Sequence, residues 1–174
     1  NYTGNTDNLS SNYSSSPKGI KAGVKTESGS GWNKTYTYAG GLVINGGTIT
    51  VSTSGNNAEG IESKNDMTIN GGTITINSYD DGINSARNMY LKGGVVTVVS
   101  KNNDGIDANA NMYISGGTVM AFGSGTPECG LDAAEGYSLY ITGGTVLAVG
   151  GNNNSVSSTT GSQALVSASG SLSA

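Results

Sequence analysis

The sequence has no histidine, one cysteine and two prolines in 174 residues. Without histidine, zinc sites built from cysteine and histidine are excluded, so any bound metal must be a hard cation held by oxygen atoms. Because Cys129 is the only cysteine, no intrachain disulfide can form. No apolar run approaches the length of a membrane span or a signal peptide, and we expect no membrane insertion. Since the chain begins with Asn1, we interpret it as a mature protein or an excised fragment.

Charge is also scarce. The 8 basic and 12 acidic residues give a formal net charge of -4, and charged residues make up 11% of the chain. The basic residues are spread thinly, so the sequence lacks the positive patch that nucleic acids and anionic membranes require of a partner. A composition rich in Gly, Asn, Ser and Thr with almost no cysteine is typical of a secreted bacterial protein. We therefore expect a secreted or cell-surface location.

What the sequence does contain is a repeat. A Gly-Gly pair followed by Thr or Val and then by Ile or Val occurs five times, and the first glycine of each pair stands at 46, 71, 93, 116 and 143. The spacings between these glycines are 25, 22, 23 and 27 residues, which predicts a solenoid with one turn per repeat. A second marker, Gly followed by Ile or Leu, occurs between the pairs at Gly19, Gly60, Gly82, Gly105 and Gly130.

Apolar residues alternate with polar ones on both sides of each Gly-Gly pair, as in strands with one buried face. One of these recurrent apolar positions is occupied by Leu42, Met67, Met89, Met112 and Leu139. Turns of this length, with short β segments, glycine at the corners and no helical periodicity, predict an all-β fold. The expected fold is a single-stranded, right-handed parallel β-helix of about five to six rungs.

The repeat also sets the expected domain organisation. Residues 1–17 are a polar N-terminal arm, residues 18–150 form the β-helix, and residues 151–174 are a C-terminal cap or tail. An insertion at about 23–38 separates the first Gly-Ile marker from the first Gly-Gly pair, and it carries Trp32 with two tyrosines. Loops on a regular scaffold commonly carry function, although these rings could equally hold the loop against the helix.

Acidic residues concentrate at the Gly-Ile corners, which hold eight of the 12 acids. Stacked rungs lie about 4.8 Å apart, so acids that recur at one position form a column of like charges. One such column contains Glu59, Asp81 and Asp104, and the other contains Glu62, Asn84, Asp107 and Asp132. Calcium takes six to eight oxygen ligands from carboxylates, amides and carbonyls and would neutralise these columns, which predicts Ca²⁺ between the rungs with the column residues, Asn84 included, as candidate ligands. The alternative is that the acids point outward into solvent.

These corners resemble a known family. Residues 18–22, 58–64, 79–84, 103–109 and 127–133 are similar to the corners of bacterial carbohydrate-binding domains of the calcium-containing, right-handed parallel β-helix type. That family occurs in cellulose- and pectate-binding surface proteins and is similar to polysaccharide lyases. The resemblance implies calcium ligands first at Asp80, Asp81, Asp104 and Asp107, and then at their rung neighbours Glu59, Glu62 and Asp132. The chain departs from the family pattern at Cys129, which replaces an acid, and at the two glutamates, which replace aspartates.

An outward-facing position three residues before the Gly-Gly pair reads Tyr90, Tyr113 and Tyr140 in successive repeats. Three stacked tyrosines would offer flat apolar faces with hydroxyls at the rims, which suits a sugar ring, although such rings also stabilise neighbouring strands without a ligand. Together with Trp32 they are the predicted carbohydrate-binding residues.

The favoured function is therefore a calcium-stabilised module that binds polysaccharide, including acidic polysaccharide, and has no catalytic residues. One alternative is a polysaccharide lyase, in which Lys64 or Arg87 would remove a proton beside calcium. The other is a self-assembling surface filament, because a β-helix exposes unpaired strand edges at both ends. The N-terminal arm would suit strand donation to a neighbouring molecule in such a filament.

Overall fold

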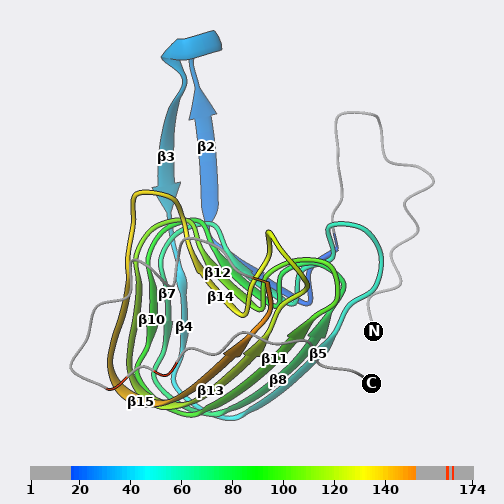
Figure 1. The fold of residues 1–174 in the computed structure, drawn as a ribbon. Coiled ribbons are helices and arrows are strands. Elements are labelled where there is room, and N and C mark those ends of the chain that lie inside the picture. The colour runs from blue at the N-terminus through cyan, green and yellow to red at the C-terminus, as the bar shows by residue number, and fades with distance from the viewer. Residues whose placement is uncertain (1–16, 152–163, 165, 167–174) are drawn as a thin grey trace.

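The computed structural model describes residues 17–151, 164 and 166, which form a parallel β-solenoid (Figure 1). The prediction of an all-β parallel β-helix is confirmed. The arm predicted for residues 1–17 and the cap or tail predicted for 151–174 lie almost entirely outside the described residues. Within the described part of the chain, no helix is both long enough and apolar enough to span a membrane.

Two parallel sheets form the solenoid. The first sheet contains, in stacking order, β1 (Ile20–Ala22), β6 (Ile61–Ser63), β9 (Ile83–Ser85), β12 (Ile106–Ala108) and β14 (Leu131–Ala133). The second sheet contains β4 (Leu42–Ile44), β5 (Thr48–Ser52), β7 (Met67–Ile69), β8 (Thr73–Ser78), β10 (Met89–Leu91), β11 (Val95–Ser100), β13 (Met112–Phe122) and β15 (Leu139–Val149). Strands β13 and β15 run through the Gly-Gly pair, whereas earlier turns divide there into two strands.

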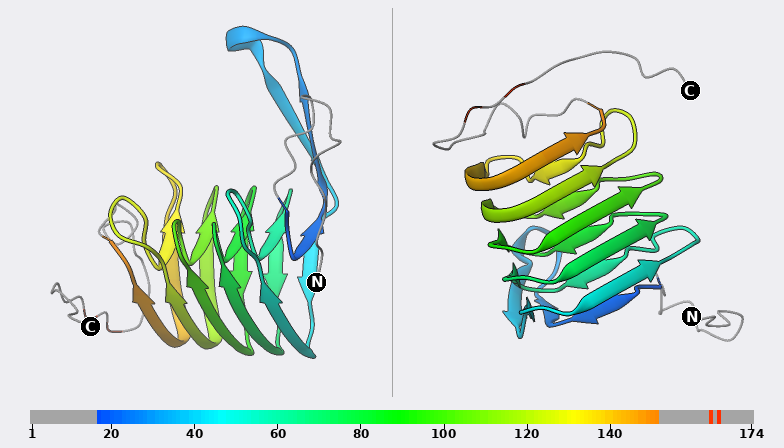
Figure 2. Two further views of the ribbon diagram at one scale, coloured as in Figure 1. Left: turned by 90° about the vertical axis from the view of Figure 1, so that its right-hand side faces the viewer. Right: turned by 90° about the horizontal axis from the view of Figure 1, so that it is seen from below.

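The strands stack as five layers, and between β1 and β14 the chain returns four times to the first sheet (Figure 2). The first layer comprises β1, β4 and β5, and the last layer comprises β14 and β15. The pairing keeps every repeat in register, so that Met89 lies between Met67 and Met112 on the neighbouring strands. Each sequence position therefore forms a column that runs the length of the solenoid.

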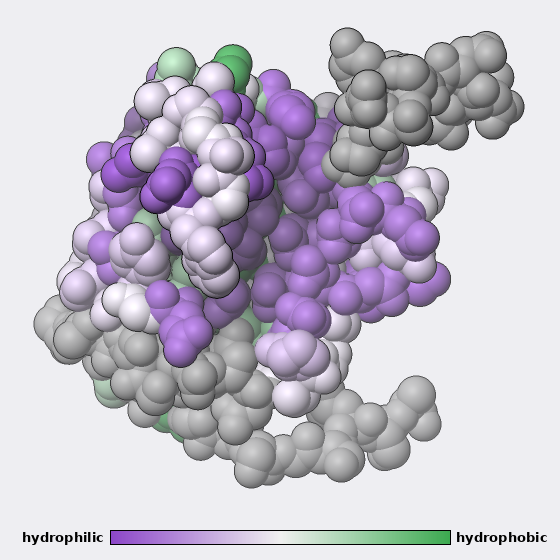
Figure 3. Space-filling view, turned by 90° about the horizontal axis from the view of Figure 1, so that it is seen from above, coloured by the Kyte–Doolittle hydropathy of each residue, from purple (hydrophilic) through white to green (hydrophobic). Residues whose placement is uncertain are grey.

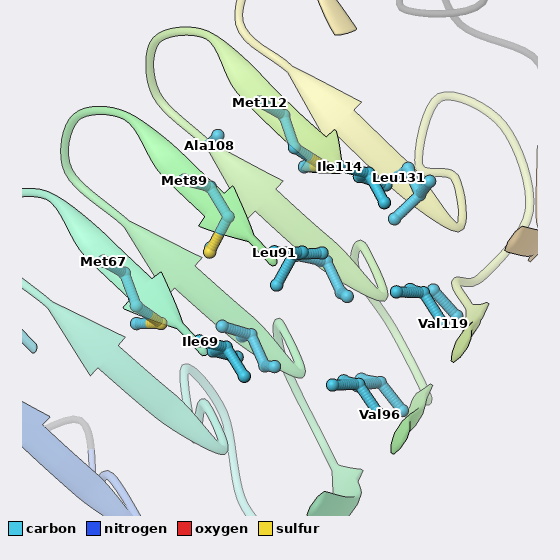
Figure 4. Packing of buried hydrophobic residues seen from close by; sticks show 14 of the residues in the cluster. Met67, Ile69, Met89, Leu91, Val96, Ala108, Met112, Ile114, Val119 and Leu131 are labelled. Atoms are coloured by element: carbon cyan, nitrogen blue, oxygen red, sulfur yellow. The ribbon is translucent and has the colours of Figure 1, made fainter. Parts of the chain in front are cut away.

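The apolar columns form the core. Met67, Met89 and Met112 are completely buried, and their side chains follow one another inside the solenoid beside Ile69, Leu91 and Ile114 (Figure 4). Valine, isoleucine and alanine of β5, β8, β11, β13 and β15 close the core from the opposite side. The alternation seen in the sequence is thus the alternation between the inside and the outside of the solenoid.

Glycine fills two columns for different reasons. Gly94, the second glycine of its pair, has a φ of +86°, and a Cβ there would lie 2.5 Å from the carbonyl oxygen of Gly72 in the layer before it. Gly82, at a Gly-Ile corner, does not have a positive φ, but a Cβ there would lie 1.8 Å from Val98 Cγ1 and 2.5 Å from the carbonyl oxygen of Gly105. The first column needs left-handed backbone, and the second needs space.

The hairpin between β1 and β4 stands apart from the solenoid. Strands β2 (Val24–Ser28) and β3 (Thr35–Ala39) pair in antiparallel fashion, and the 3-10 helix η1 (Gly31–Asn33) forms the tip. The hairpin rises from the side of the solenoid and not from its end (Figures 1 and 2). Its side chains are mostly exposed, and Lys25 Nζ lies 4.3 Å from the centre of the Tyr36 ring.

The crowding at Gly82 leads to a prediction about stability. Gly82→Ala forces a methyl group against Val98 and a backbone carbonyl, and we expect it to lower the free energy of unfolding by about 1–3 kcal/mol or more. Gly125→Ala is the matched control, because no atom lies within 4 Å of a Cβ at Gly125. Its effect should stay within about 0.5 kcal/mol in urea denaturation. Equal stability of the two variants would contradict the packing described above.

Candidate functional site

Two charged columns run side by side along the Gly-Ile corners. The register of the first sheet aligns Lys21, Glu62, Asn84, Asp107 and Asp132 in one column, which we call the inner-strand column. Backbone hydrogen bonds between the glycine of one layer and the residue before the glycine of the next align the second column, which we call the corner column. Its members are Lys18, Glu59, Asp81, Asp104 and Cys129.

At the N-terminal end of both columns, lysines neutralise the acids. Lys18 Nζ lies 2.9 Å from Glu59 Oε1, and Lys21 Nζ lies 3.1 Å from Oε2 of the buried Glu62. Lys64 also pairs with Glu62. Burial alone would raise the pKa of Glu62, but the hydrogen bonds from Lys64 and Lys21 lower it. The first two layers therefore carry their own counter-ions.

Glu59, the glutamate of the corner column, pairs with one lysine, whereas Glu62 pairs with two. Oε2 of Glu59 is buried without a hydrogen-bond partner among the described residues. Burial is the main reason why the pKa of Glu59 is raised, and the charge of Glu62 adds to it, in spite of the hydrogen bond from Lys18. Glu59 thus sits where lysine neutralisation ends and the aspartate-rich part of the column begins.

In the third layer, the side-chain amide of Asn84 occupies the column position that Lys21 occupies in the first layer. Asn84 Nδ2 donates to Asp81 Oδ2 at 2.9 Å and to Asp107 Oδ2 at 2.7 Å, so one NH2 group joins carboxylates from both columns. Asn109 Nδ2 donates a further hydrogen bond of 3.1 Å to Asp107 Oδ2. A neutral amide leaves the charge of both carboxylates uncompensated.

The same carboxylates also hold the layers together through the backbone. Asp81 Oδ1 accepts a hydrogen bond of 3.2 Å from the N–H of Asp104, and Asp104 Oδ1 accepts one of 2.6 Å from the N–H of Cys129. Each aspartate of the corner column thus binds the backbone of the next layer. Cys129, where the repeat lacks an acid, is buried and its Sγ lies 2.9 Å from the carbonyl oxygen of Leu131.

Burial and mutual repulsion perturb these aspartates strongly. Burial, together with the charges of Asp81, Asp132 and Asp104, raises the pKa of Asp107 to about 9. Burial is also the main cause that raises the pKa of Asp81 to about 7 and that of Asp104 to about 6. A cation of suitable size would relieve this repulsion.

Of the eight predicted calcium ligands, the structure brings Asp81, Asn84 and Asp107 into direct contact. Asp80 lies beside them but turns its Oδ1 to the side-chain amide of Asn103, at 2.9 Å. Asp104 and Asp132 lie in the two columns, while the glutamates contact lysines. Within residues 17–151, 164 and 166, no three Cys, Asp or Glu side chains converge in the way that a metal centre built from such side chains alone would require.

The predicted tyrosine column forms on the outer face of the second sheet. The Tyr90 and Tyr113 rings stack at 5.1 Å between centroids with an interplanar angle of 7°, and the Tyr113 and Tyr140 rings stack at 4.8 Å and 5°. The rings therefore cover one another, and both faces of Tyr113 are occupied by its neighbours. Instead of the row of free flat faces expected from the sequence, this column presents ring edges and hydroxyls.

Basic side chains accompany the tyrosines. Lys92 Nζ lies 5.6 Å from the centre of the Tyr90 ring, and the Arg87 guanidinium lies 5.2 Å from that of Tyr38 at the base of the hairpin. Burial and the nearby Asp66 raise the pKa of Tyr90, so its hydroxyl remains a hydrogen-bond donor at neutral pH. The second sheet thus carries a strip of aromatic edges with Lys92 beside Tyr90, and Arg87, over the Tyr38 ring, lies near enough for its charge to act on the Tyr90 hydroxyl. We call this set the tyrosine strip: Tyr90, Tyr113, Tyr140, Arg87 and Lys92.

Trp32 lies in η1 at the tip of the hairpin and does not belong to the tyrosine column. It is 104% exposed, so both faces of its indole are open to solvent. Figure 3 looks onto the side toward which the hairpin projects, and the described surface there is mostly hydrophilic. Trp32 is therefore the residue among the four predicted sugar contacts that does offer a free flat face.

Sequence reasoning missed the lysines at the start of the charged columns. The signal was present, because Lys18 and Lys21 flank Gly19-Ile20 at the same positions where later corners carry acids. The cations beside the tyrosines were harder to find, since the flexible side chains of Arg87 and Lys92 reach rings at other positions of the repeat.

The fold and these sites define a β-solenoid with an external strip of aromatic and basic side chains and an internal row of acids. The chain belongs to the family of carbohydrate-binding domain-containing proteins, whose family model matches residues 5–173. No curated protein and no solved structure matches the chain. The family and the fold support carbohydrate binding and suggest a polysaccharide partner and a non-catalytic role.

The raised pKa values predict an unusual pH dependence. Between about pH 4, where an unfolded aspartate ionises, and about pH 9, the folded chain binds more protons than the unfolded chain, so stability falls as pH rises. With a chelator present, we expect the thermal midpoint to be higher at pH 5 than at pH 8. Asp107→Asn removes the most perturbed group and should reduce this slope, by at most about 1.4 kcal/mol per pH unit.

Glu135→Gln is the control for this measurement, because Glu135 is an exposed acid outside both columns. Calorimetric scans in chelator from pH 4 to pH 9 would compare the three proteins. A wild-type midpoint that rises steadily over this range would show that the aspartates are not stabilised in their protonated form.

Proposed function

We propose that this chain is an extracellular carbohydrate-binding protein that binds acidic polysaccharide along the tyrosine strip and is stabilised by calcium. The observation that carries the proposal is the stacked tyrosine column with Lys92 and Arg87 beside it, in a chain of a carbohydrate-binding family. The Asn-, Ser-, Thr- and Gly-rich composition with one cysteine supports the extracellular location.

The strip suits an extended, negatively charged sugar chain. Successive tyrosines lie about one strand spacing apart and present their hydroxyls in a row, which can bind hydroxyls along a polymer. The guanidinium of Arg87 can pair with a sugar carboxylate through two parallel hydrogen bonds, and Lys92 supplies a second positive charge. Trp32 adds a separate flat surface on which one sugar ring can pack.

Calcium in this proposal stabilises the aspartate-rich layers. The donor chemistry fits, because Asp81, Asp107 and Asn84 meet at one point and are surrounded by further carboxylates. The two ends of a carboxamide have the same shape, so Asn84 can turn its oxygen toward a cation. Asp81, Asp107 and Asn84 would hold the ion, and Asp104 and Asp132 would add charge nearby. Calcium takes amide and backbone oxygens as well as carboxylates, so it does not require three converging acids.

A lyase activity is disfavoured by the contacts of the two residues that would act as the base. Lys64 pairs with the buried Glu62, and Arg87 lies against the Tyr38 ring with its Nε 3.9 Å from Asp66 Oδ1. Lys64 therefore acts as a counter-charge to Glu62, and the Arg87 guanidinium is oriented by Tyr38 and Asp66. We infer a binding protein without catalytic activity.

The tyrosine strip is tested by removing its charges. Lys92→Gln and Arg87→Gln should each weaken binding to polygalacturonate about two- to fivefold, because an exposed charge pair contributes about 0.5–1 kcal/mol. The matched control is Lys101→Gln, since Lys101 Nζ also lies over a tyrosine ring, at 5.5 Å from Tyr79, but outside the strip. Affinity electrophoresis in gels containing polygalacturonate would give the three dissociation constants. If the Lys101 variant loses as much affinity as the others, the binding face lies elsewhere.

Calcium is tested by thermal unfolding at pH 8. Adding CaCl2 to chelator-treated protein should raise the midpoint, by the equivalent of about 2.7 kcal/mol when calcium is at a hundred times its dissociation constant. Asp107→Asn should lose most of this rise, whereas Glu135→Gln should keep it, with NaCl at equal ionic strength as the blank. An equal rise in both variants, or none in the wild type, would remove calcium from the proposal.

A further inference from the structure

The hairpin formed by β2 and β3 has two unlike faces. Because side chains alternate between the faces of paired strands, one face carries Lys25, Glu27, Tyr36 and Tyr38. The other face carries Val24, Thr26, Ser28, Thr35, Thr37 and Ala39. The tyrosines and the charged side chains of the two strands are therefore confined to one face, which we call the tyrosine face of the hairpin.

The tyrosine face is turned toward the solenoid. Arg87, in the turn between β9 and β10, places its guanidinium carbon 5.2 Å from the centre of the Tyr38 ring. The hairpin is attached to the first layer and Arg87 belongs to the third, so the hairpin leans over the second layer, and Figure 2 shows it inclined in that direction. The hairpin and the side of the solenoid thus meet in a corner that contains Tyr38 and Arg87.

The base of the hairpin holds it at this angle. Gly23 and Gly40 flank the two strands with φ of +77° and +68°, which is left-handed backbone that favours glycine. Asn65 of the second layer donates from Nδ2 to the carbonyl oxygen of Gly40 at 2.5 Å. The backbone therefore directs the tyrosine face toward the solenoid, and the contact with Arg87 adds to it.

Two cations lie against the Tyr38 ring without a close carboxylate. Lys25 Nζ lies 5.8 Å from the ring centre, and Lys25 forms no salt bridge among the described residues. Arg87 Nε lies 3.9 Å from Asp66 Oδ1, which is too far for a hydrogen bond. The same Asp66 oxygen accepts a hydrogen bond of 3.0 Å from the N–H of Asn88 instead. Both cations thus keep their N–H donors for a ligand.

The acid on the tyrosine face is already paired. Glu27 Oε1 lies 2.6 Å from Lys34 Nζ, and the hydrogen bond from Lys34 lowers the pKa of Glu27. Together with Asp66, two acids therefore face three cations in this part of the surface. The excess positive charge favours a negatively charged ligand.

We propose that Lys25 and Arg87, held against Tyr38, form a carboxylate-binding subsite in the corner between the hairpin and the solenoid, which takes uronate residues of the polysaccharide that binds the tyrosine strip. We call Lys25, Tyr36, Tyr38 and Arg87 the hairpin subsite. This inference rests on the proposed function and deepens it, because it makes the sugar carboxylate the recognised group and the hairpin a second wall of the binding surface.

The tyrosine rings prepare both cations for this role. A guanidinium placed over a ring keeps the N–H groups at its edge for two parallel hydrogen bonds to a carboxylate. Lys25 Nζ lies 4.3 Å from the centre of the Tyr36 ring and has three donors of its own. Cation–π contacts restrict both side chains before a ligand arrives, which reduces the entropy lost on binding. The hydroxyls of the tyrosines can bind sugar hydroxyls beside them.

Arg87 connects the hairpin subsite to the tyrosine strip. Its guanidinium lies over Tyr38 of the hairpin, and its charge acts on the hydroxyl of Tyr90 in the strip. A polymer that follows the strip along the layers therefore reaches the hairpin at Arg87. Binding at one of two adjoining surfaces raises the effective concentration at the other, so the hairpin favours long chains over short ones.

The charge of the subsite is tested by Lys25→Gln. In affinity electrophoresis this variant should bind polygalacturonate about two- to fivefold more weakly than the wild type, as expected for one exposed charge pair. Its binding to fully methyl-esterified polygalacturonate, whose carboxylates are neutral, should equal that of the wild type. Lys101→Gln is the matched control, because Lys101 Nζ also lies over a tyrosine ring but outside the strip and the hairpin. Equal affinities for polygalacturonate in the Lys25 and Lys101 variants, or an equal loss with the esterified polymer, would overturn the subsite.

A second variant removes the hairpin and keeps the strip. Val24 and Ala39 are the pair at its base, so a two-residue Asn-Gly turn in place of residues 24–39 can join Gly23 to Gly40. The preference for polygalacturonate over trigalacturonate should fall at least about tenfold, because the second surface is gone. The thermal midpoint should stay close to that of the wild type, since the side chains of the hairpin are mostly exposed.

The outcomes separate this inference from the proposed function. If Lys92→Gln weakens polygalacturonate binding while Lys25→Gln and removal of the hairpin leave it unchanged, the strip binds sugar and the hairpin subsite is overturned. If the wild type does not bind polygalacturonate, the proposed function and the hairpin subsite are overturned together.

Discussion

The interaction on which this structure depends is the in-register stacking of equivalent layers. Each layer hydrogen-bonds to the next through its backbone, so any residue type that recurs in the repeat becomes a column at the strand spacing. For apolar residues this is favourable, because the methionine and isoleucine columns form a continuous core. For glycine it allows two backbones to approach closely at Gly82 and Gly94. For acids it is unfavourable, because like charges are held about 4.8 Å apart and out of water.

The repulsion between stacked acids is relieved in different ways along the chain. Lysines neutralise the glutamates at the N-terminal end, and the amide of Asn84 separates two aspartates in the middle. Further along, burial and the neighbouring carboxylates raise the pKa values of Asp81 and Asp107, which disfavours their charged forms. Calcium binding, as proposed, acts on these columns by placing a cation among the aspartates.

The fold could be predicted because the Gly-Gly pair and the Gly-Ile corner each recur five times in the sequence. The Gly-Gly spacing set the turns, and the alternation around Met67, Met89 and Met112 set the inside of the solenoid. The site was less predictable because it depends on residues that do not recur. Lys18 occupies an acidic position only once, and Lys92 reaches Tyr90 through a flexible side chain. The tyrosine column was predicted from the sequence, but the covering of Tyr113 by its neighbours was not, although both follow from the strand spacing.

The central claim is that sugar binds on the outer face of the second sheet, while the acidic columns serve the stability of the layers. The most direct measurement is an NMR titration of isotope-labelled protein with oligogalacturonate in the presence of calcium. The tyrosine strip predicts chemical-shift changes at Tyr90, Lys92 and Arg87, with the indole of Trp32 as a separate contact. Changes confined to the Gly-Ile corners around Asp81 and Asp107, with the tyrosine strip unaffected, would contradict it.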